Sequence, residues 1–219
     1  MRQFVATYLD PASRLGEILF GLIMVLTVTL FAGLTVSKGS TGAHELLVAA
    51  IGCNIAWGVI DAVMYLMSCI TVRTGKMRLV QAIQNAPDPQ VALGLIQTEV
   101  EPELQELLDP EEARAFSQSV LKHLGHARVS KSLLTRDDAY GALACFWLVF
   151  VSCVPAAIPF LLFSRPHVAL RVSNFLLLAM LFAVGRKWAR YAGTDELWTG
   201  LSMLAIGLVL VGIAMLLGG

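Results

Sequence analysis

Long apolar stretches constrain the fold of this chain more than any other feature of its sequence. A run of about 20 apolar residues forms a helix long enough to cross the roughly 30 Å hydrocarbon core of a bilayer. Four such stretches lie at Ile18–Ser37, Leu46–Val72, Ala139–Ser164 and Leu197–Gly219. A fifth, Val172–Gly185, is shorter and completes a crossing if Arg171 reaches outward to the headgroups. The sequence therefore predicts an all-α, polytopic membrane protein with five transmembrane helices.

Composition agrees with this class and excludes others. Hydrophobic residues make up 57% of the chain, and its formal net charge is zero. The mean hydropathy is +0.71, well above the usual range of soluble proteins. We expect no nucleic-acid partner, because a neutral chain has no bulk attraction to phosphates. Neither the cysteines nor His123 and His126 have the spacing of a nucleophile or of catalytic zinc, so we expect no enzyme.

The four cysteines all lie inside the apolar stretches, at Cys53, Cys69, Cys145 and Cys153. A thiol in such surroundings most often packs as a small hydrophobic side chain. The sequence thus predicts no disulfide framework.

Basic residues indicate how the chain is oriented, because short loops rich in Lys and Arg stay in the cytoplasm. With five helices and a cytoplasmic N-terminus, 13 of the 16 basic residues fall inside. The three outside are Lys38, Arg165 and Arg171. We therefore expect a multi-pass protein with its N-terminus in the cytoplasm and its C-terminus outside, in a plasma (cell inner) membrane or a vacuole-type membrane.

The segment between the second and third spans differs in composition from its surroundings. It predicts a division into helices 1 and 2 (residues 1–72), an acidic cytoplasmic helical domain (73–138) and helices 3 to 5 (139–219). Within this domain we expect helices at about 73–86, 90–108 and 109–126. The second is interrupted or kinked at Pro102, and the third begins with Asp109 as its cap and Pro110 in its first turn.

Acidic residues gather in this domain. Carboxylates three or four residues apart on a helix can grip one ion, and imidazoles nearby would suit Mn(II) or Fe(II). The candidate ligands are Glu99, Glu103, Glu106, Glu112 and His123. The alternative is a solvated acidic surface whose first-turn acids favour the helix dipole.

Asp61 is the acid inside the second apolar stretch. An ionised carboxylate at mid-membrane costs at least ~2.5–3.5 kcal/mol, so it is expected to face a partner, an ion or water. Glu17 and Met24 form a line on the first helix, and Met64 lies one turn from Asp61. Together they suggest a route for a partly dehydrated cation. Each residue also has a purely structural interpretation: an interfacial Glu17, methionines that fill core gaps, and an Asp61 hydrogen-bonded to Asn54 or Trp57.

Five spans, a cytoplasmic helical insert after the second, and prolines in the third resemble the vacuolar iron transporter family over nearly the whole chain. The resemblance implies a homodimer that exchanges protons for Fe(II) or Mn(II) and whose insert glutamates collect ions. Where the first helix of the family reads Phe-Gly-x-x-Asp-Gly, this chain has Met24 after Phe20-Gly21. Where the second reads Ser-Met-x-x-Gly-Glu-Tyr, Met64 precedes Tyr65, and Asp61 stands one turn away as a relocated carboxylate.

The sequence therefore predicts a proton-coupled transporter that exports Fe2+ or Mn2+ from the cytosol. The metal is its cargo, and no tightly bound cofactor is expected. Its expected partners are the lipid bilayer, the metal ion and a second copy of the chain. The alternative is a non-transporting membrane protein whose acidic domain docks a cytosolic partner.

Overall fold

The structure is a computed structural model that describes residues 2–36, 43–104, 109–125 and 132–218. These residues are almost entirely helical, and no strand occurs among them. Five of the described helical segments are long and apolar enough to cross a membrane. The predicted all-α polytopic fold is confirmed. The spans are Pro11–Leu30, Leu47–Gln84, Arg136–Leu162, Pro166–Ala192 and Glu196–Ile213.

The chain divides into two compact units, each with its own packing. The membrane unit comprises Met1–Leu66 and Arg136–Gly219, and the insert unit comprises Met67–Thr135. The helix α3 (Ala43–Gln84) contributes to both.

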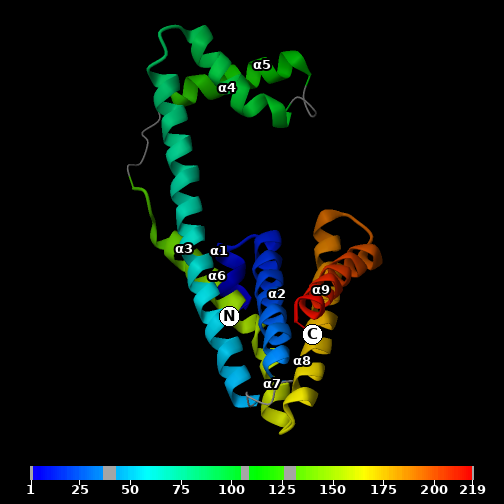
Figure 1. Cartoon of the computed structure of the whole chain (residues 1–219). Helices are drawn as coiled ribbons and strands as arrows, with labels where there is room; N and C mark the ends of the chain where they lie inside the picture. Colours follow the sequence, from blue (N-terminus) through cyan, green and yellow to red (C-terminus); the bar gives the residue numbers. More distant parts are fainter. Residues whose placement is uncertain (1, 37–42, 105–108, 126–131, 219) are drawn as a thin grey trace. The chain divides into compact units, whose positions relative to one another are not determined.

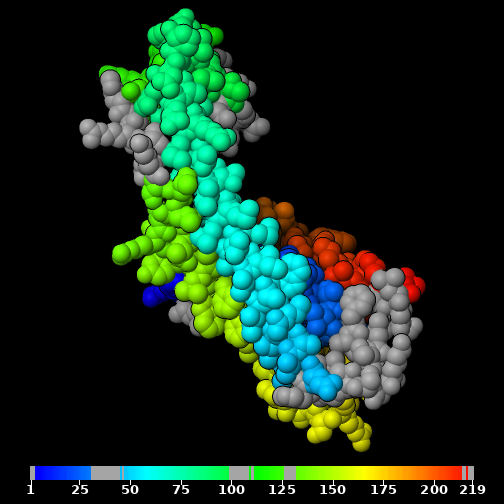
Figure 2. Space-filling model, turned by 60° about the vertical axis from the view of Figure 1, so that its left-hand side comes forward, coloured from blue at the N-terminus to red at the C-terminus, as the bar shows by residue number. Residues whose placement is uncertain are grey.

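Within the membrane unit, α3 is joined by six helices that the described residues form. They are α1 (Arg2–Tyr8), α2 (Pro11–Val36), α6 (Arg136–Ser152), α7 (Val154–Leu162), α8 (Pro166–Ala192) and α9 (Glu196–Gly218). The central helix is α2, which packs on α6, α8 and α9 (Figure 1). The main buried cluster joins Leu22 and Leu26 of α2 to Leu177 and Leu181 of α8. Figure 2 shows α3 in cyan between α6 and α2 on one face of this unit.

Backbone chemistry explains where several helices end. Asp10 precedes Pro11 and accepts hydrogen bonds from the backbone N–H groups of Ala12 and Ser13, at 2.9 and 3.0 Å. It therefore caps α2, and Pro11 starts the helix where no N–H partner is needed. Gly193 ends α8 with φ 68°, a left-handed conformation that glycine adopts without steric cost.

The third span is broken close to its prolines. α6 ends at Ser152 and α7 begins at Val154, with Pro155 in its first turn. At the break the N–H of Cys153 bonds to the Phe150 carbonyl at 3.2 Å. The carbonyl of Val149, one residue earlier, thereby loses its usual helical donor.

The helix α1 was not predicted from the sequence. Phe4 and Val5 of α1, with Leu9 just after it, pack against Ala144, Cys145 and Leu148 of α6. A cluster of Phe4, Tyr8 and Tyr140, with ring centroids 5.1–6.1 Å apart, joins the same two helices. These apolar positions recur at the helical spacing, but seven residues are too few to show a clear period.

The insert unit contains the end of α3 together with α4 (Pro89–Leu104) and α5 (Pro110–Leu124). The three predicted helices are present, and α4 continues as helix through Pro102. Its core joins Ile83, Ala92 and Ile96. Gln84 donates its amide to the Leu124 carbonyl at 2.9 Å, which ties the end of α3 to the end of α5.

Candidate functional site

Two acids from different spans meet inside the membrane unit. The side chain of Glu17, on the second turn of α2, lies beside the side chain of Asp61 on α3. Both residues are half-buried. Oδ2 of Asp61 is buried and has no hydrogen-bond partner. Two carboxyl groups can share a hydrogen bond only if one of them carries a proton. Two facing carboxyl groups are stable together when they share a proton or hold another cation between them.

The Cys145 thiol of α6 completes the contact, because it also lies within hydrogen-bond reach of Glu17. Cys145 is fully buried. Neither acid has a Lys or Arg partner, since the ion pairs recorded among the described residues join Arg186 and Arg190 to Glu196. An unpaired carboxyl pair within a low-dielectric bundle favours any cation that can replace basic side chains.

A second polar layer lies about one helical turn further along α2. Asn54 of α3 is fully buried and donates its amide to the Val149 carbonyl at 2.9 Å. Ser152 donates to the same carbonyl at 2.6 Å. The break between α6 and α7 thus leaves an acceptor that these two side chains satisfy. Oδ1 of Asn54 is buried without a hydrogen-bond partner.

Close helix approach brings this layer together. A Cβ atom at Gly21 of α2 would overlap the Ser152 hydroxyl and lie 2.9 Å from the Val149 carbonyl. A Cβ atom at Gly58 of α3 would lie 3.0 Å from the Phe146 ring. Phe20 and Trp57 meet edge to face at 5.5 Å between α2 and α3. Glycines therefore allow α2 and α3 to pack tightly on α6 at the level of the polar groups.

A third polar group lies further along α2 again. Thr29 is buried and donates its hydroxyl to Oδ1 of Asn174 on α8 at 2.7 Å. Ser173, beside Asn174, is also buried and donates to the Ala156 carbonyl of α7 at 2.9 Å. The polar groups of the membrane unit thus occur at three levels of α2, around Glu17, Gly21 and Thr29.

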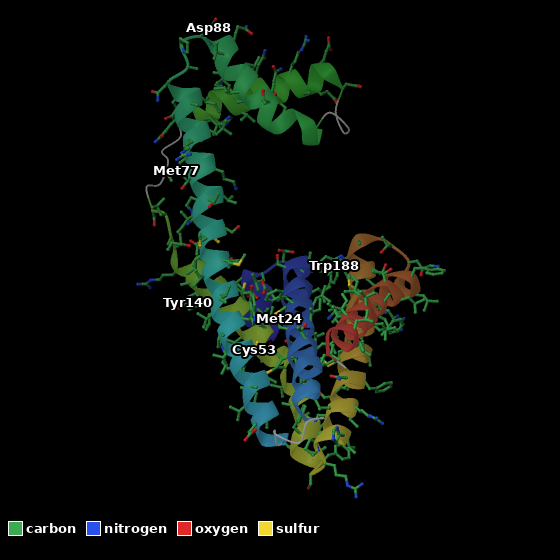
Figure 3. The ribbon with its side chains drawn as sticks, viewed as in Figure 1. Met24, Cys53, Met77, Asp88, Tyr140 and Trp188 are labelled. Carbon is green, nitrogen blue, oxygen red and sulfur yellow. The ribbon has the colours of Figure 1, made fainter. Side chains whose placement is uncertain are left out.

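The structure brings some predicted site residues together and separates others. Met24 is half-buried on α2, between the second and third levels (Figure 3). Met64 has 60% of its surface exposed, so within a single chain it does not join Asp61. Residues on the inner face of α3 are instead Asn54, Gly58 and Tyr65, whose ring packs over Gly141.

Among the predicted ligands of the insert unit, the structure describes the side chains of Glu112 and His123, and each serves its own helix. Glu112 forms a capping box at the start of α5, where Oε2 accepts the N–H of Asp109 at 3.3 Å. His123 is exposed, and Nδ1 contacts the Ser119 carbonyl of its own helix at 2.8 Å. Glu99 and Glu103 lie on the backbone of α4, with side chains outside the described part of the structure, and Glu106 lies outside the described residues.

No group of three or more His, Cys, Asp or Glu side chains that could hold a metal ion occurs among the described residues. Glu17, Asp61 and Cys145 bring two carboxyl groups and a thiol near one another, and a metal would need further ligands there. Sequence reasoning missed Cys145, Ser152 and Asn174. The available signal was their polarity inside spans that otherwise consist of apolar residues, since such groups require internal partners.

Comparison with known proteins identifies the family. No curated protein matches the sequence. Residues 75–219, about two thirds of the chain, match the VIT family, whose members are membrane transporters of metal ions. The match covers the insert unit from the end of α3 and all of α6 to α9, and it does not include Glu17 or Asp61. With its five apolar spans and a match of this extent, the chain belongs to the VIT family, the vacuolar iron transporters.

Proposed function

We propose that this protein transports a divalent transition metal, Fe(II) or Mn(II), out of the cytosol in exchange for protons. The observation that carries the proposal is the proximity of the Glu17 and Asp61 carboxyl groups within the membrane unit. A carboxyl pair that shares a proton can release it when a metal binds. Exchange of the two cations at one site is the chemical basis of antiport.

The groups around this pair suit a borderline cation. Carboxylates favour Mn(II) and Fe(II), whereas a thiol or thioether adds affinity for softer ions. Cys145 already contacts Glu17, and Met24 lies two helical turns further along α2. A metal would bind first to the carboxylates and then pass Met24, with the polar layers around Asn54 and Thr29 offering oxygen ligands beyond. The metal is cargo in this scheme, so weak and successive sites are an advantage.

The resemblance to the family supplies the remaining parts of the proposal. Glu99, Glu103 and Glu106 of the insert would collect ions from the cytosol, with Glu112 and His123 beside them. Two copies of the chain would form the working unit. Met64, exposed on a single chain, would then act as a ligand only where the second copy covers it.

A transport assay in proteoliposomes tests the central step. Metal uptake is followed with a trapped fluorescent chelator and proton movement with a pH dye. We expect Asp61→Asn and Glu17→Gln each to slow uptake by about 10- to 100-fold, the usual effect of disturbing a ligand set. Proton movement should be lost together with metal uptake in these variants, because the neutral amide cannot exchange a proton.

Glu45→Gln is the matched control. Glu45 is an exposed acid in the first turn of α3, outside the bundle. Its substitution should leave both signals unchanged. Metal uptake at the wild-type rate by Asp61→Asn would contradict the assigned role of the pair.

A docking function for the insert is the second candidate, favoured by one observation. Glu112 already serves the start of α5, and Glu111 and Glu112 are exposed rather than arranged around an ion. Titration of Mn2+ into the full-length protein, followed by electron paramagnetic resonance, separates the two. Loss of bound Mn2+ in a variant with Glu99, Glu103 and Glu106 changed to Gln supports ion collection. Unchanged binding in that variant favours docking.

A further inference from the structure

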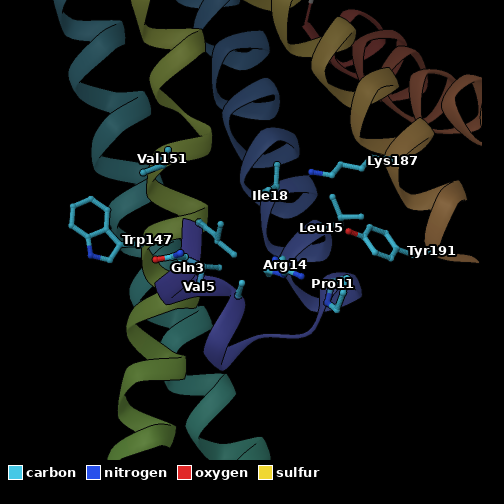
Figure 4. Close-up of a pocket in the computed structure, with 12 residues that line it drawn as sticks. Gln3, Val5, Pro11, Arg14, Leu15, Ile18, Trp147, Val151, Lys187 and Tyr191 are labelled. Atoms are coloured by element: carbon cyan, nitrogen blue, oxygen red, sulfur yellow. The ribbon is translucent and has the colours of Figure 1, made fainter. Parts of the chain in front are cut away.

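A cavity of about 550 Å³ lies in the membrane unit, apart from the Glu17–Asp61 pair. Its wall is formed by α1, α2, α6 and α8 (Figure 4). The size falls in the range of sites that hold small molecules. Nothing in the proposed transport route uses this cavity, so its lining requires its own explanation.

Two cationic side chains line the cavity without a carboxylate partner. Arg14 of α2 donates Nε to the backbone carbonyl of Asp10 at 3.3 Å. The Asp10 carboxylate is already engaged by Ser13 and two backbone N–H groups. Lys187 of α8 is exposed and has no ion pair among the described residues. The site thus has two positive charges that no acid of the described chain neutralises.

The ion pairs formed by the neighbours of Lys187 bear on its lack of an ion-pair partner. Arg186 and Arg190 both bind Glu196, with N–O distances of 2.9 and 2.8 Å. Glu196, in the first turn of α9, is therefore occupied by the two arginines, and Asp195 beside it accepts the N–H of Trp198. Lys187, which projects from α8 towards Ile18 in Figure 4, faces the cavity instead.

The rest of the lining is mostly apolar. Leu15 and Ile18 of α2 and Leu148 and Val151 of α6 form one side of the cavity. Val151 is 39% exposed, so this side continues to the surface that the span presents to lipid. An occupant must therefore be anionic at one end and apolar at the other.

The depth of the site agrees with such a molecule. Arg14 lies on the first turn of α2, and Lys187 lies in the last two turns of α8. These are the ends of two spans, where headgroups meet the hydrocarbon. Tyr191, which also lines the cavity, belongs to a residue type enriched at that level. Basic pockets between transmembrane helices commonly bind the headgroups of anionic lipids.

We propose that this cavity binds one anionic phospholipid, with its phosphate between Arg14 and Lys187 and an acyl chain along Leu148 and Val151. A zwitterionic lipid would place a second cation beside two others. A free phosphate would leave the apolar side unfilled. The combination of both features therefore selects a lipid with net negative charge.

Native mass spectrometry of the full-length protein tests the proposal. Wild type should retain one phosphatidylglycerol, bound at least about 10-fold more tightly than phosphatidylcholine, as expected for two basic contacts. Arg14→Gln with Lys187→Gln should reduce phosphatidylglycerol to the level of phosphatidylcholine. The matched control changes Arg165 and Arg171 to Gln at the opposite end of α8, and it should retain the lipid.

Two further experiments distinguish binding of a whole lipid in the cavity from binding of phosphate alone. Ala6→Trp keeps both cations but fills the cavity that Ala6 lines, so it should also lose the lipid, and it serves if the double variant fails to fold. Inorganic phosphate in millimolar excess should not displace the lipid. Equal phosphatidylglycerol binding by wild type and the Arg14, Lys187 variant would overturn the proposal, as would retention by Ala6→Trp or displacement by phosphate.

Discussion

Single residues decide how closely the spans can approach. Gly21 and Gly16 both lie on α2, but only Gly21 packs against another helix, because nothing lies within 4 Å of a Cβ atom at Gly16. We expect Gly21→Ala to lower the melting temperature in detergent, since the added methyl group meets the Ser152 hydroxyl and the Val149 backbone. Gly16→Ala should leave it unchanged or raise it, because alanine favours helix by about 0.8–1 kcal/mol over glycine.

The double variant Gly21→Ala with Ser152→Ala sharpens this test. Removing the hydroxyl relieves one contact but leaves the Val149 carbonyl 2.9 Å from the new Cβ. Partial recovery of the melting temperature is therefore expected. Equal melting temperatures for Gly21→Ala and Gly16→Ala would show that the close approach does not exist.

Asp10 provides a pH-dependent contribution outside the spans. Hydrogen bonds from the Ser13 hydroxyl and from backbone N–H groups hold the pKa of its carboxyl below the ordinary value of 3.8. The stabilisation is complete above the unfolded pKa and is lost as the pH falls through the lower native pKa. Asp10→Ala should cost about 1 kcal/mol at neutral pH, the usual value of a helix cap.

The measurement is the melting temperature of wild type and Asp10→Ala as a function of pH. The difference between the two should shrink below about pH 4 and fall to the small value that an uncharged cap provides once the native carboxyl is protonated. Asp10→Asn, which keeps an oxygen that can cap the helix, should lie between them. A difference that is constant from neutral pH to acid would contradict a role for the charge.

At the scale of elements, the spans were predictable and their orientation about their own axes was not. Length and composition are enough to identify five spans, and Asp109 with Pro110 is enough to place the start of α5. The inward face of α3 is a finer question. Met64 and Gly58 lie three residues either side of Asp61, about 60° to its left and right around the helix.

Only the structure shows that α3 turns Gly58 inward, against Phe146, and Met64 outward. A membrane helix is apolar on all sides, so its sequence gives little periodicity to decide between the two. The same reason hid Cys145, which looks like any small hydrophobic residue of the third span. A buried acid can be recognised in the sequence because burying its charge costs free energy. Burying a thiol such as Cys145 has no such cost, so the sequence does not reveal it as a partner of the acids.

The turn between α8 and α9 supports a prediction about these two elements. Gly193 adopts φ 68° between them, and a residue with a Cβ atom is strained there. We expect Gly193→Ala to destabilise the protein by about 1 kcal/mol and Gly193→Asn by less, since asparagine tolerates this conformation better. Thermal unfolding in detergent measures the difference. Equal stability of the wild type and Gly193→Ala would show that α8 ends in another way.

At the scale of the whole molecule, the two units carry different parts of the proposed function. The family match extends over the insert unit and the last three spans, whereas the carboxyl pair lies in the first two. If the acids of a transporter move by one or two turns along their helices, the chemistry can be kept, provided the new acids still meet. The contact of Glu17 with Asp61 meets that condition.

The orientation of the whole chain follows from its charges and can be tested directly. We expect single cysteines at Gln118 in α5 and Thr194 after α8 to lie on the cytosolic side, and one at Ser164 before α8 to lie on the opposite side. The reason is that Arg186, Lys187 and Arg190 gather at the end of α8 near Thr194, while only Arg165 and Arg171 lie near Ser164.

The measurement is labelling by a membrane-impermeant maleimide in intact and in opened vesicles, on a background with the four native cysteines changed to Ser or Ala. All three substituted positions are exposed in the structure, so the side of the membrane and not burial controls their reaction. The cysteines at Gln118 and Thr194 should be labelled under the same condition, either intact or opened vesicles. The cysteine at Ser164 should be labelled under the other condition. Two spans lie between Gln118 and Thr194: α6 with α7, and α8. If the two positions reacted from different sides, an odd number of crossings would separate them. The two spans could then not both cross the membrane.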